Sequence, residues 1–174
     1  MAKYYKRRFR KRTGKWSSNI QSLRLEGDAP ANSNFGDSIT IAQNPGQSST
    51  SVSQRFTVKN IEITGIFELD NTSASTVSLV EDLTYYIMYV PEGYVIDLTL
   101  PTKHPEWIMA YKYIGSTLNA NSTQTVQPPR IKTRLSRKLN SGDSIIFLYT
   151  GLNRHINDLN VRFMGLTRWW TKAN

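Results

Sequence analysis

The amino-acid sequence predicts an all-β domain and, within that class, a jelly roll. Apolar residues recur with a period of two along several short segments, and polar or turn-forming stretches separate these segments. No segment has the apolar pattern of a helix longer than two turns. About eight strands with long polar loops suit a β-sandwich or barrel, and the jelly roll fits this strand count in a chain of 174 residues.

The first clear strand contains a change of phase. From Ile61 to Leu69 the apolar residues at odd-numbered positions share one face, with polar residues on the other. The preceding Phe56 and Val58 stand at even-numbered positions, so the apolar residues change from even to odd positions along this segment. The change near Asn60 predicts a bulge or a break between two strands.

Aromatic and aliphatic residues fill the middle of the chain. Leu83–Val90 is apolar at both parities, which predicts a strand buried on both faces or one that faces a neighbouring subunit. Pro91–Gly93 ends this strand as a turn, and Val95–Leu100 is predicted as the next strand, ended by Pro101. Trp107–Ile114 is predicted as a further strand.

The last third of the chain predicts two more strands. The turn-forming Asn140–Asp143 precedes a strong strand at Asp143–Tyr149, and Leu159–Trp170 is predicted as the last strand. The segments between strands are polar and are predicted as exposed loops; they cover residues 27–37, 43–53, 71–78 and 119–127.

Charge divides the chain into two parts. The first 25 residues carry nine Lys and Arg side chains and no acid, whereas the other 149 carry 13 Lys and Arg and 13 Asp and Glu. The whole net charge of +9 therefore lies in the first segment. We predict a basic arm at residues 1–16, which lacks the apolar residues needed to fold alone, and a jelly-roll domain at residues 17–174.

The arm has the composition of a nucleic-acid-binding segment. Lys and Arg neutralise phosphates and release counterions, and aromatic rings stack on unpaired bases, so the pattern favours a single strand. A nuclear localisation signal or a solubilising tail is the alternative, and the first is compatible with nucleic-acid binding. The nucleic-acid-binding residues predicted in the arm are Lys3, Tyr4, Tyr5, Lys6, Arg7, Arg8, Phe9, Arg10, Lys11, Arg12, Lys15 and Trp16.

A second basic element is predicted at residues 129–139. In an extended strand Arg130, Lys132, Arg134 and Lys138 share one face, and this face is predicted to contact nucleic acid or a neighbouring subunit. The opposite, apolar face is formed by Ile131, Leu135 and Leu139. An ordinary solvated strand face or a short helix is the alternative, although the two prolines at 128 and 129 disfavour a helix start.

Patterns for catalysis or metal binding are sparse. The chain has no Cys, and its two histidines, His104 and His155, lack a metal-ligand spacing and are predicted to lie at the surface. The acid pairs at residues 81–82 and 68/70 flank predicted loops, where solvated acids are common. We therefore predict no enzyme, no cofactor and no metal site, and no segment is apolar enough to predict a membrane helix.

Several segments together resemble the capsid proteins of circoviruses and circovirus-like viruses, whose genomes are circular single-stranded DNA. They are KYYKRRFRKR, YYIMYVPEGY, RIKTRLSRKLNSGDSIIFLYTG and VRFMGLTRWW. The resemblance implies a single jelly roll of two packed four-stranded sheets. It also implies about 60 copies in a T=1 icosahedral shell with the arm inside on the genome.

The partners and location follow from the same resemblance. Single-stranded nucleic acid is expected, with DNA favoured over RNA, together with other copies of the chain, a host importin and an attachment receptor. No membrane partner is expected. The protein is expected in the virion and, during assembly, in the host nucleus.

Three other functions remain open at this stage. The coat protein of a small RNA satellite virus would have the same arm and domain. A cellular or ribosomal-type protein that binds single-stranded nucleic acid would be expected to have a basic body, but this body is neutral. An enzyme or lectin on a jelly roll is the third alternative, and a cupin-type enzyme would need a cluster of His and carboxylate ligands.

Overall fold

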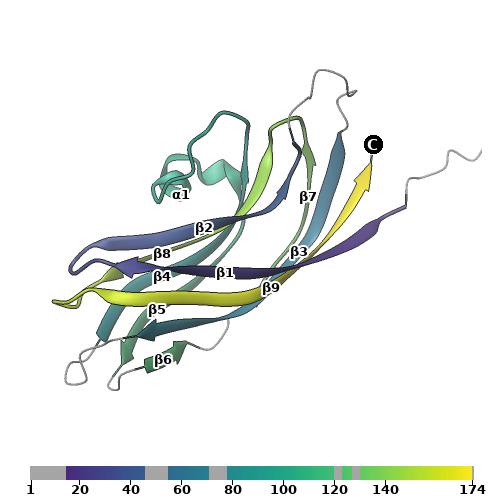
Figure 1. Ribbon diagram of the computed structural model, residues 1–174. Helices are drawn as coiled ribbons and strands as arrows, with labels where there is room; N and C mark the ends of the chain where they lie inside the picture. The colour runs from purple at the N-terminus through teal and green to yellow at the C-terminus, as the bar shows by residue number, and fades with distance from the viewer. Residues whose placement is uncertain (1–14, 46–54, 71–77, 120–122, 127–129, 174) are drawn as a thin grey trace, which may run out of the picture.

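Two antiparallel sheets face each other in the computed structural model, which describes residues 15–45, 55–70, 78–119, 123–126 and 130–173 (Figure 1). Within these ranges the chain forms nine strands and two short helical segments. In chain order they are β1 (Ser17–Ala29), β2 (Asn34–Gln43), β3 (Phe56–Asp70), β4 (Ser78–Val90), α1 (Leu100–Lys103), the 3-10 helix η1 (Pro105–Trp107), β5 (Ile108–Asn119), β6 (Thr123–Val126), β7 (Ile131–Leu139), β8 (Ser144–Asn153) and β9 (Leu159–Ala173). No helix in the described part of the chain is long and apolar enough to cross a bilayer.

The strand order is that of a jelly roll. One sheet, here called sheet A, has the order β1-β9-β3, with β6 and β7 both paired to the far edge of β3. The other, sheet B, has the order β2-β8-β4-β5. The chain crosses repeatedly between the sheets, as in two interlocked Greek keys. The prediction of a jelly roll is confirmed, with one refinement: β6 and β7 occupy successive stretches of one edge, so sheet A has five strands in four positions.

Aromatic side chains fill the space between the sheets. Phe67 of sheet A contacts Tyr149 of sheet B edge-on, with ring centres 5.3 Å apart. Phe163 and Phe147 lie 4.6 Å apart across the same interface. Such aromatic pairs add to the free energy gained from burying their apolar area. The inward faces of both sheets therefore form one continuous core.

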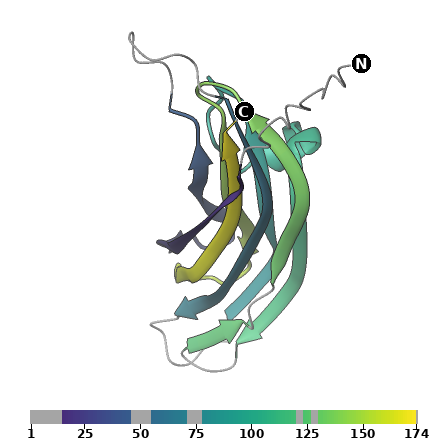
Figure 2. The same ribbon diagram turned by 90° about the vertical axis from the view of Figure 1, so that its right-hand side faces the viewer.

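The central strands of sheet B, β4 and β8, are buried on both sides. Tyr85 and Ile87 of β4 point into the core between the sheets, whereas Met88 and Val90 lie beneath Leu100 of α1 in a second, smaller core. This confirms the first of the two predictions for Leu83–Val90. Figures 1 and 2 show α1 beside sheet B, near the end of the sandwich at which the C-terminus lies.

The strand predicted at Val95–Leu100 is wrong. Residues 91–99 form turns and extended chain without a strand partner, and Leu100 begins α1. Leu98 and Leu100 of this segment cover the outer face of sheet B instead of extending it, whereas Val95 is 80% exposed. Leu98, for example, packs on Gly36 of β2, where a Cβ atom would lie 2.7 Å from Leu98 Cδ2.

The phase change near Asn60 is a β-bulge within one strand. Asn60 has a φ of 52°, and the register of β3 with both β7 and β9 shifts after Lys59. The extra residue lets Val58 and Ile61 both remain fully buried. The bulge therefore joins two stretches of opposite parity into one strand of 15 residues.

The turn predicted at Asn140–Asp143 is confirmed, and it is held by a buried carboxylate. Asp143 is 4% exposed and accepts hydrogen bonds from Tyr89 Oη at 2.8 Å, from the Asn140 backbone N–H at 2.8 Å and from the Glu92 backbone N–H at 3.2 Å. These bonds join the β7–β8 turn to the end of β4.

Two tyrosines of β4 are predicted to respond oppositely to loss of the hydroxyl. Tyr85 Oη is buried without a hydrogen-bond partner among the described residues, whereas Tyr89 Oη donates to Asp143. Tyr85→Phe should raise the free energy of unfolding by about 1 kcal/mol, and Tyr89→Phe should lower it by about 1.5 kcal/mol. Urea unfolding of both variants measures the difference, and a Tyr85→Phe variant as destabilised as Tyr89→Phe would contradict the buried, unpaired hydroxyl.

Stability is predicted to fall at alkaline pH. Burial raises the pKa of Tyr85 and of Tyr149 well above the usual range, and burial together with the Asp143 hydrogen bond raises the pKa of Tyr89 to about 12. Unfolded tyrosines lose their protons near pH 10, so the native state binds more protons above that pH and its stability declines toward pH 12. The urea midpoint should be lower at pH 11 than at pH 9, and Tyr85→Phe should make this difference smaller. Equal midpoints at the two pH values would refute the prediction.

Candidate nucleic-acid interface

The outer face of sheet A carries a group of cations and indole rings at one end. Strand β9 alternates strictly there, with Thr167 and Trp169 facing the core and Arg168, Trp170 and Lys172 facing outward. Residues of β3 and β7 extend the group across the sheet. We call it the cationic patch; its members are Trp16, Lys59, Lys138, Arg168, Trp170 and Lys172.

Strand register brings the members of the patch together. Lys59 of β3 pairs with Trp170 of β9, and Thr57 pairs with Lys172 on one side and Lys138 on the other. Opposed residues of antiparallel strands lie on the same face about 5 Å apart. The cations of three strands therefore converge on one surface.

The indole rings lie among these cations. Lys59 Nζ is 3.8 Å from the centre of the Trp16 ring, and Arg168 Cζ is 4.8 Å from the centre of the Trp170 ring. Cation–π contacts at these distances hold both partners in place. The arrangement places indole faces beside positive charges on a partly exposed surface.

The predicted face of Arg130, Lys132, Arg134 and Lys138 is divided by a carboxylate. Glu62 of β3 lies 2.6 Å from Arg130 Nη2 and 3.8 Å from Lys132 Nζ, so two of the four cations share one carboxylate. Arg134 and Lys138 are exposed and form no ion pair with another described residue. All four are exposed; register places Lys138 in the row of Lys172, with Thr57 between them, and Lys132 in the row of Arg168, with Glu62 between them.

The apolar side of this element differs from its prediction. Ile131 and Leu139 are buried as expected, but Leu135 is 53% exposed. Strand β7 lies at the edge of sheet A, and Leu135 falls where its register with β3 shifts, opposite the bulge at Asn60 and outside the regular pairing. The predicted face of three apolar residues is therefore wrong at its middle position.

The predicted arm residues are placed only at their last two positions. Lys3, Tyr4, Tyr5, Lys6, Arg7, Arg8, Phe9, Arg10, Lys11 and Arg12 lie outside the described residues. Lys15 is exposed, and Trp16 is part of the patch. Because Ser17 pairs with Thr171, the chain enters the described body beside the cationic end of β9.

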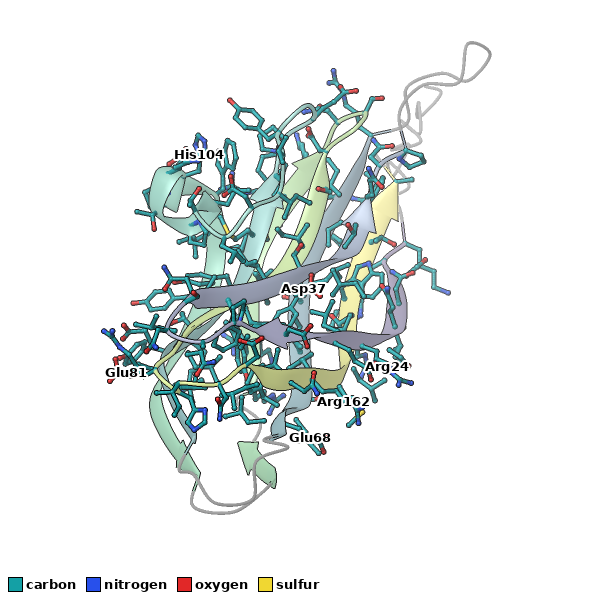
Figure 3. All side chains as sticks on the ribbon, turned by 60° about the vertical axis from the view of Figure 1, so that its left-hand side comes forward. Arg24, Asp37, Glu68, Glu81, His104 and Arg162 are labelled. Atoms are coloured by element: carbon teal, nitrogen blue, oxygen red, sulfur yellow. The ribbon has the colours of Figure 1, made fainter. Side chains whose placement is uncertain are left out.

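The other end of the same face is neutralised by its own charges. Glu26 lies 2.8 Å from both Arg24 and Arg162, and Arg162 also approaches Glu68 at 3.9 Å. Figure 3 shows Arg24, Arg162 and Glu68 gathered there. The Arg24 hydrogen bond holds the pKa of Glu26 below its usual range. A shallow hollow of about 450 Å³ lies beside Glu26, Asp28 and Glu68.

The histidines and acid pairs occupy structural positions. His155 is 5% exposed, so its predicted surface position is wrong: it lies buried in the β8–β9 loop, and its Nδ1 accepts a hydrogen bond from the Asn157 backbone N–H. His104 is partly exposed and stacks on Trp107. Glu81 pairs with Arg154 at 2.9 Å. Among described side chains, no three His, Asp or Glu converge as metal ligands.

Sequence reasoning missed Lys59, Arg168, Trp170 and Lys172. The signal was present in the alternation of residues 159–169, where every second residue is apolar, Gly or Thr and all of these except Gly165 are buried. The contribution of Lys59 depends on the register of β3 with β9, which the sequence does not reveal. The patch as a whole suits phosphate neutralisation by cations and stacking of unpaired bases on indoles.

Comparisons with known proteins find similarity only among solved structures. No protein-family model and no curated protein matches the chain. The structure of turnip yellow mosaic virus matches with 14% identity and a TM-score of 0.33, over 87% of this chain and 92% of that chain. The 60-mer of the BFDV capsid protein matches with 8% identity and a TM-score of 0.36, over 93% and 95%, and its decamer with 7% and 0.31, over 92% and 99%. At these values the likeness assigns no function.

Two lysines on the same face of β7 are predicted to differ in their effect on nucleic-acid binding. Lys138 has no carboxylate partner among the described residues, whereas Lys132 shares Glu62 with Arg130. For binding to a single-stranded oligonucleotide, the logarithm of the binding constant falls linearly with the logarithm of salt concentration. Lys138→Gln should make the slope of this line shallower by about 0.7. Lys132→Gln is the matched control and should change it less. A larger change for Lys132→Gln would contradict the assignment of the patch.

Proposed function

We propose that this protein is the coat protein of a small virus, that about 60 copies form a T=1 shell, and that the shell packages circular single-stranded DNA. The jelly-roll body would build the shell, and the basic arm and the cationic patch would hold the genome. This division of labour matches the distribution of charge, because the net positive charge lies in the first 25 residues and the body is neutral.

The observation that carries the proposal is the continuity between arm and patch. The arm joins the body at Trp16, and Lys59 Nζ lies over the Trp16 ring. Lys138, Trp170 and Lys172 lie close to Lys59 on the same face of sheet A. A polyanion held by the arm would meet further cations on the folded domain. One end of sheet A therefore extends the basic surface that the arm begins.

The chemistry of this surface favours binding of single-stranded nucleic acid without regard to its base sequence. Lysine and arginine contacts act on phosphates, which carry no base information. Trp16 and Trp170 offer ring faces to unpaired bases, which a duplex keeps stacked inside. Binding should be strongly salt-dependent, as expected for packaging a genome of any sequence.

The same arm would direct the protein to the host nucleus. Lys3–Arg12 contains the clustered lysines and arginines that importins bind. Nuclear import and genome binding use the same charges at different times. An attachment receptor would contact the outside of the shell.

The main rival is a protein that binds single-stranded nucleic acid without assembling. The cationic patch would also suit this rival, but the neutral net charge of the body counts against it, because such a protein would be expected to have a basic body. Analytical centrifugation and negative-stain microscopy of the purified chain distinguish them. Uniform shells of about 60 copies support the coat function, and a monomer under all salt and pH conditions rejects it.

Removal of the arm is predicted to separate packaging from folding. Deletion of residues 2–14 takes away seven Lys and Arg side chains but none of the described residues. Co-purifying nucleic acid should drop several-fold, while the unfolding transition of the body stays unchanged. Sequencing of the nucleic acid retained by the full chain identifies DNA or RNA. Undiminished nucleic acid after the deletion would show that the arm is not the binder.

A further inference from the structure

The outer face of sheet A has an apolar middle. Between its cationic end and its Arg–carboxylate end, four outward-facing side chains of the neighbouring strands β1, β9 and β3 are apolar (Figure 1). We call this group the apolar patch; its members are Ile20, Ile66, Met164 and Leu166. Ile20, Leu166 and Ile66 are 67%, 53% and 39% exposed, and Met164 is partly exposed. Apolar side chains that adjoin one another at the surface indicate a binding site, whereas isolated ones do not.

Strand register makes the apolar patch continuous. Met164 of β9 pairs with Ile66 of β3, and Leu166 is the next outward-facing residue of β9. Ile20 of β1 pairs with Arg168 of β9, so Ile20 lies diagonally from Leu166. Paired side chains on one face are about 5 Å apart, and diagonal or successive ones are about 7 Å apart. The four apolar side chains therefore form one surface that ends beside the guanidinium group of Arg168.

The side of the apolar patch that adjoins the cationic patch attracts anions. Arg168 and Lys59 lie there, and the ion pairs that the described residues of this face form do not include either of them. The carboxylate opposite Arg168 by register is Glu62, and it is shared by Arg130 and Lys132. Positive charge therefore exceeds negative charge on this side of the apolar patch.

The opposite side of the apolar patch carries carboxylates. Arg24 pairs with Glu26, and Arg162 pairs with Glu26 and approaches Glu68. The two cations and two carboxylates sum to zero, and the carboxylates repel a further anion. An anion held at the edge of the apolar patch therefore lies on the side of the cationic patch.

The cation beside the apolar patch restricts what can cover it. Arg168 is paired with Ile20 and is one outward position from Leu166, so a partner that covers these two side chains also covers the guanidinium group. A neutral partner would bury this charge without compensation, which costs free energy. The partner must therefore carry an anion close to an apolar surface.

A nucleotide of a single strand meets both requirements. Its phosphate is an anion, and the ring faces of its unpaired base are available for apolar contact. Successive outward residues of a strand lie about 7 Å apart, and the phosphate and base of one nucleotide are separated by a comparable length. The cationic patch joins the apolar patch to Trp16 at the end of the basic arm, so a phosphate backbone is the anion continuous with both. A carboxylate on a second protein chain is the rival anion.

We propose that the apolar patch binds the unpaired bases of a single strand whose phosphates cross the neighbouring cations at Arg168 and Lys59. This role rests on the proposed function and deepens it, because it gives the bound strand an orientation, with its bases over Leu166 and Ile20. Aliphatic side chains contact the ring face of any base, so they favour unpaired bases without selecting a sequence. A duplex keeps its bases stacked inside and would leave the apolar patch uncovered.

Abasic oligonucleotides separate base contacts from phosphate contacts. An oligothymidylate of about 12 nucleotides and an abasic oligomer of the same length carry the same charge, and the full chain should bind the first about tenfold more tightly. Leu166→Ser should weaken binding of the oligothymidylate about fivefold and change binding of the abasic oligomer less than about twofold. The ratio of the two affinities is measured on one preparation, so a partly unfolded variant does not alter it. Equal weakening of both oligomers by Leu166→Ser would overturn the proposal.

The chain offers a matched control for the apolar patch. Ile20 belongs to the patch, whereas Ile156 lies in the β8–β9 loop, and the two are 67% and 73% exposed. Ile20→Ser should reduce the preference for oligothymidylate over the abasic oligomer about threefold. Ile156→Ser should leave this preference unchanged, and an equal reduction by both variants would count against the patch as the site of base contact.

Assembly of the same variants separates this proposal from the coat function. If Leu166→Ser prevents assembly but keeps the full preference for oligothymidylate, the apolar patch contacts another protein chain, and the proposal is wrong while the coat function stands. If the unmodified chain prefers oligothymidylate and Leu166→Ser removes the preference, but no shells form, the base-binding patch stands and the coat function fails. If neither oligomer binds the unmodified chain, the patch and the packaging role both fail.

Discussion

The cations of sheet A face outward because their neighbours along the same strands are held inward. In β9, Phe163 and Trp169 are buried between the sheets, and Trp170 and Lys172 alternate with the buried positions. The side-chain period of a strand is two, so a slip of one residue against β1 or β3 would bury charges and expose the core. The free energy of core burial therefore fixes the position of the cationic patch as well as the fold.

Much of the fold could be predicted because it follows from local alternation. The bulge at Asn60 and the two-sided burial of Leu83–Val90 are both visible as changes in apolar parity. Strands β1 and β2 lay partly within stretches predicted as polar loop, because edge strands need only one apolar face. The strand predicted at Val95–Leu100 is wrong for another reason. Leu98 and Leu100 cover sheet B while Val95 is exposed, and a local pattern does not say which surface an apolar residue will meet.

The candidate site could be predicted only in part because its charges act across strands. The pairing of Glu62 with Arg130 and Lys132 depends on the register of β3 with β7, and the sequence contains no record of that register. The same register brings Lys59 and Lys138 into one surface. Net charge likewise concealed the local pattern, since a neutral body has a cationic end, a self-neutralised Arg–carboxylate end and an apolar patch.

The central claim is that the outer face of sheet A lies against single-stranded nucleic acid inside a shell of identical copies. Electron cryomicroscopy of nucleic-acid-containing particles tests it most directly. We expect Lys59 and Trp170 to face the particle interior, with nucleic-acid density against the cationic patch. Particles in which this face points to the outside solvent, with the nucleic-acid density against another surface, would contradict the account.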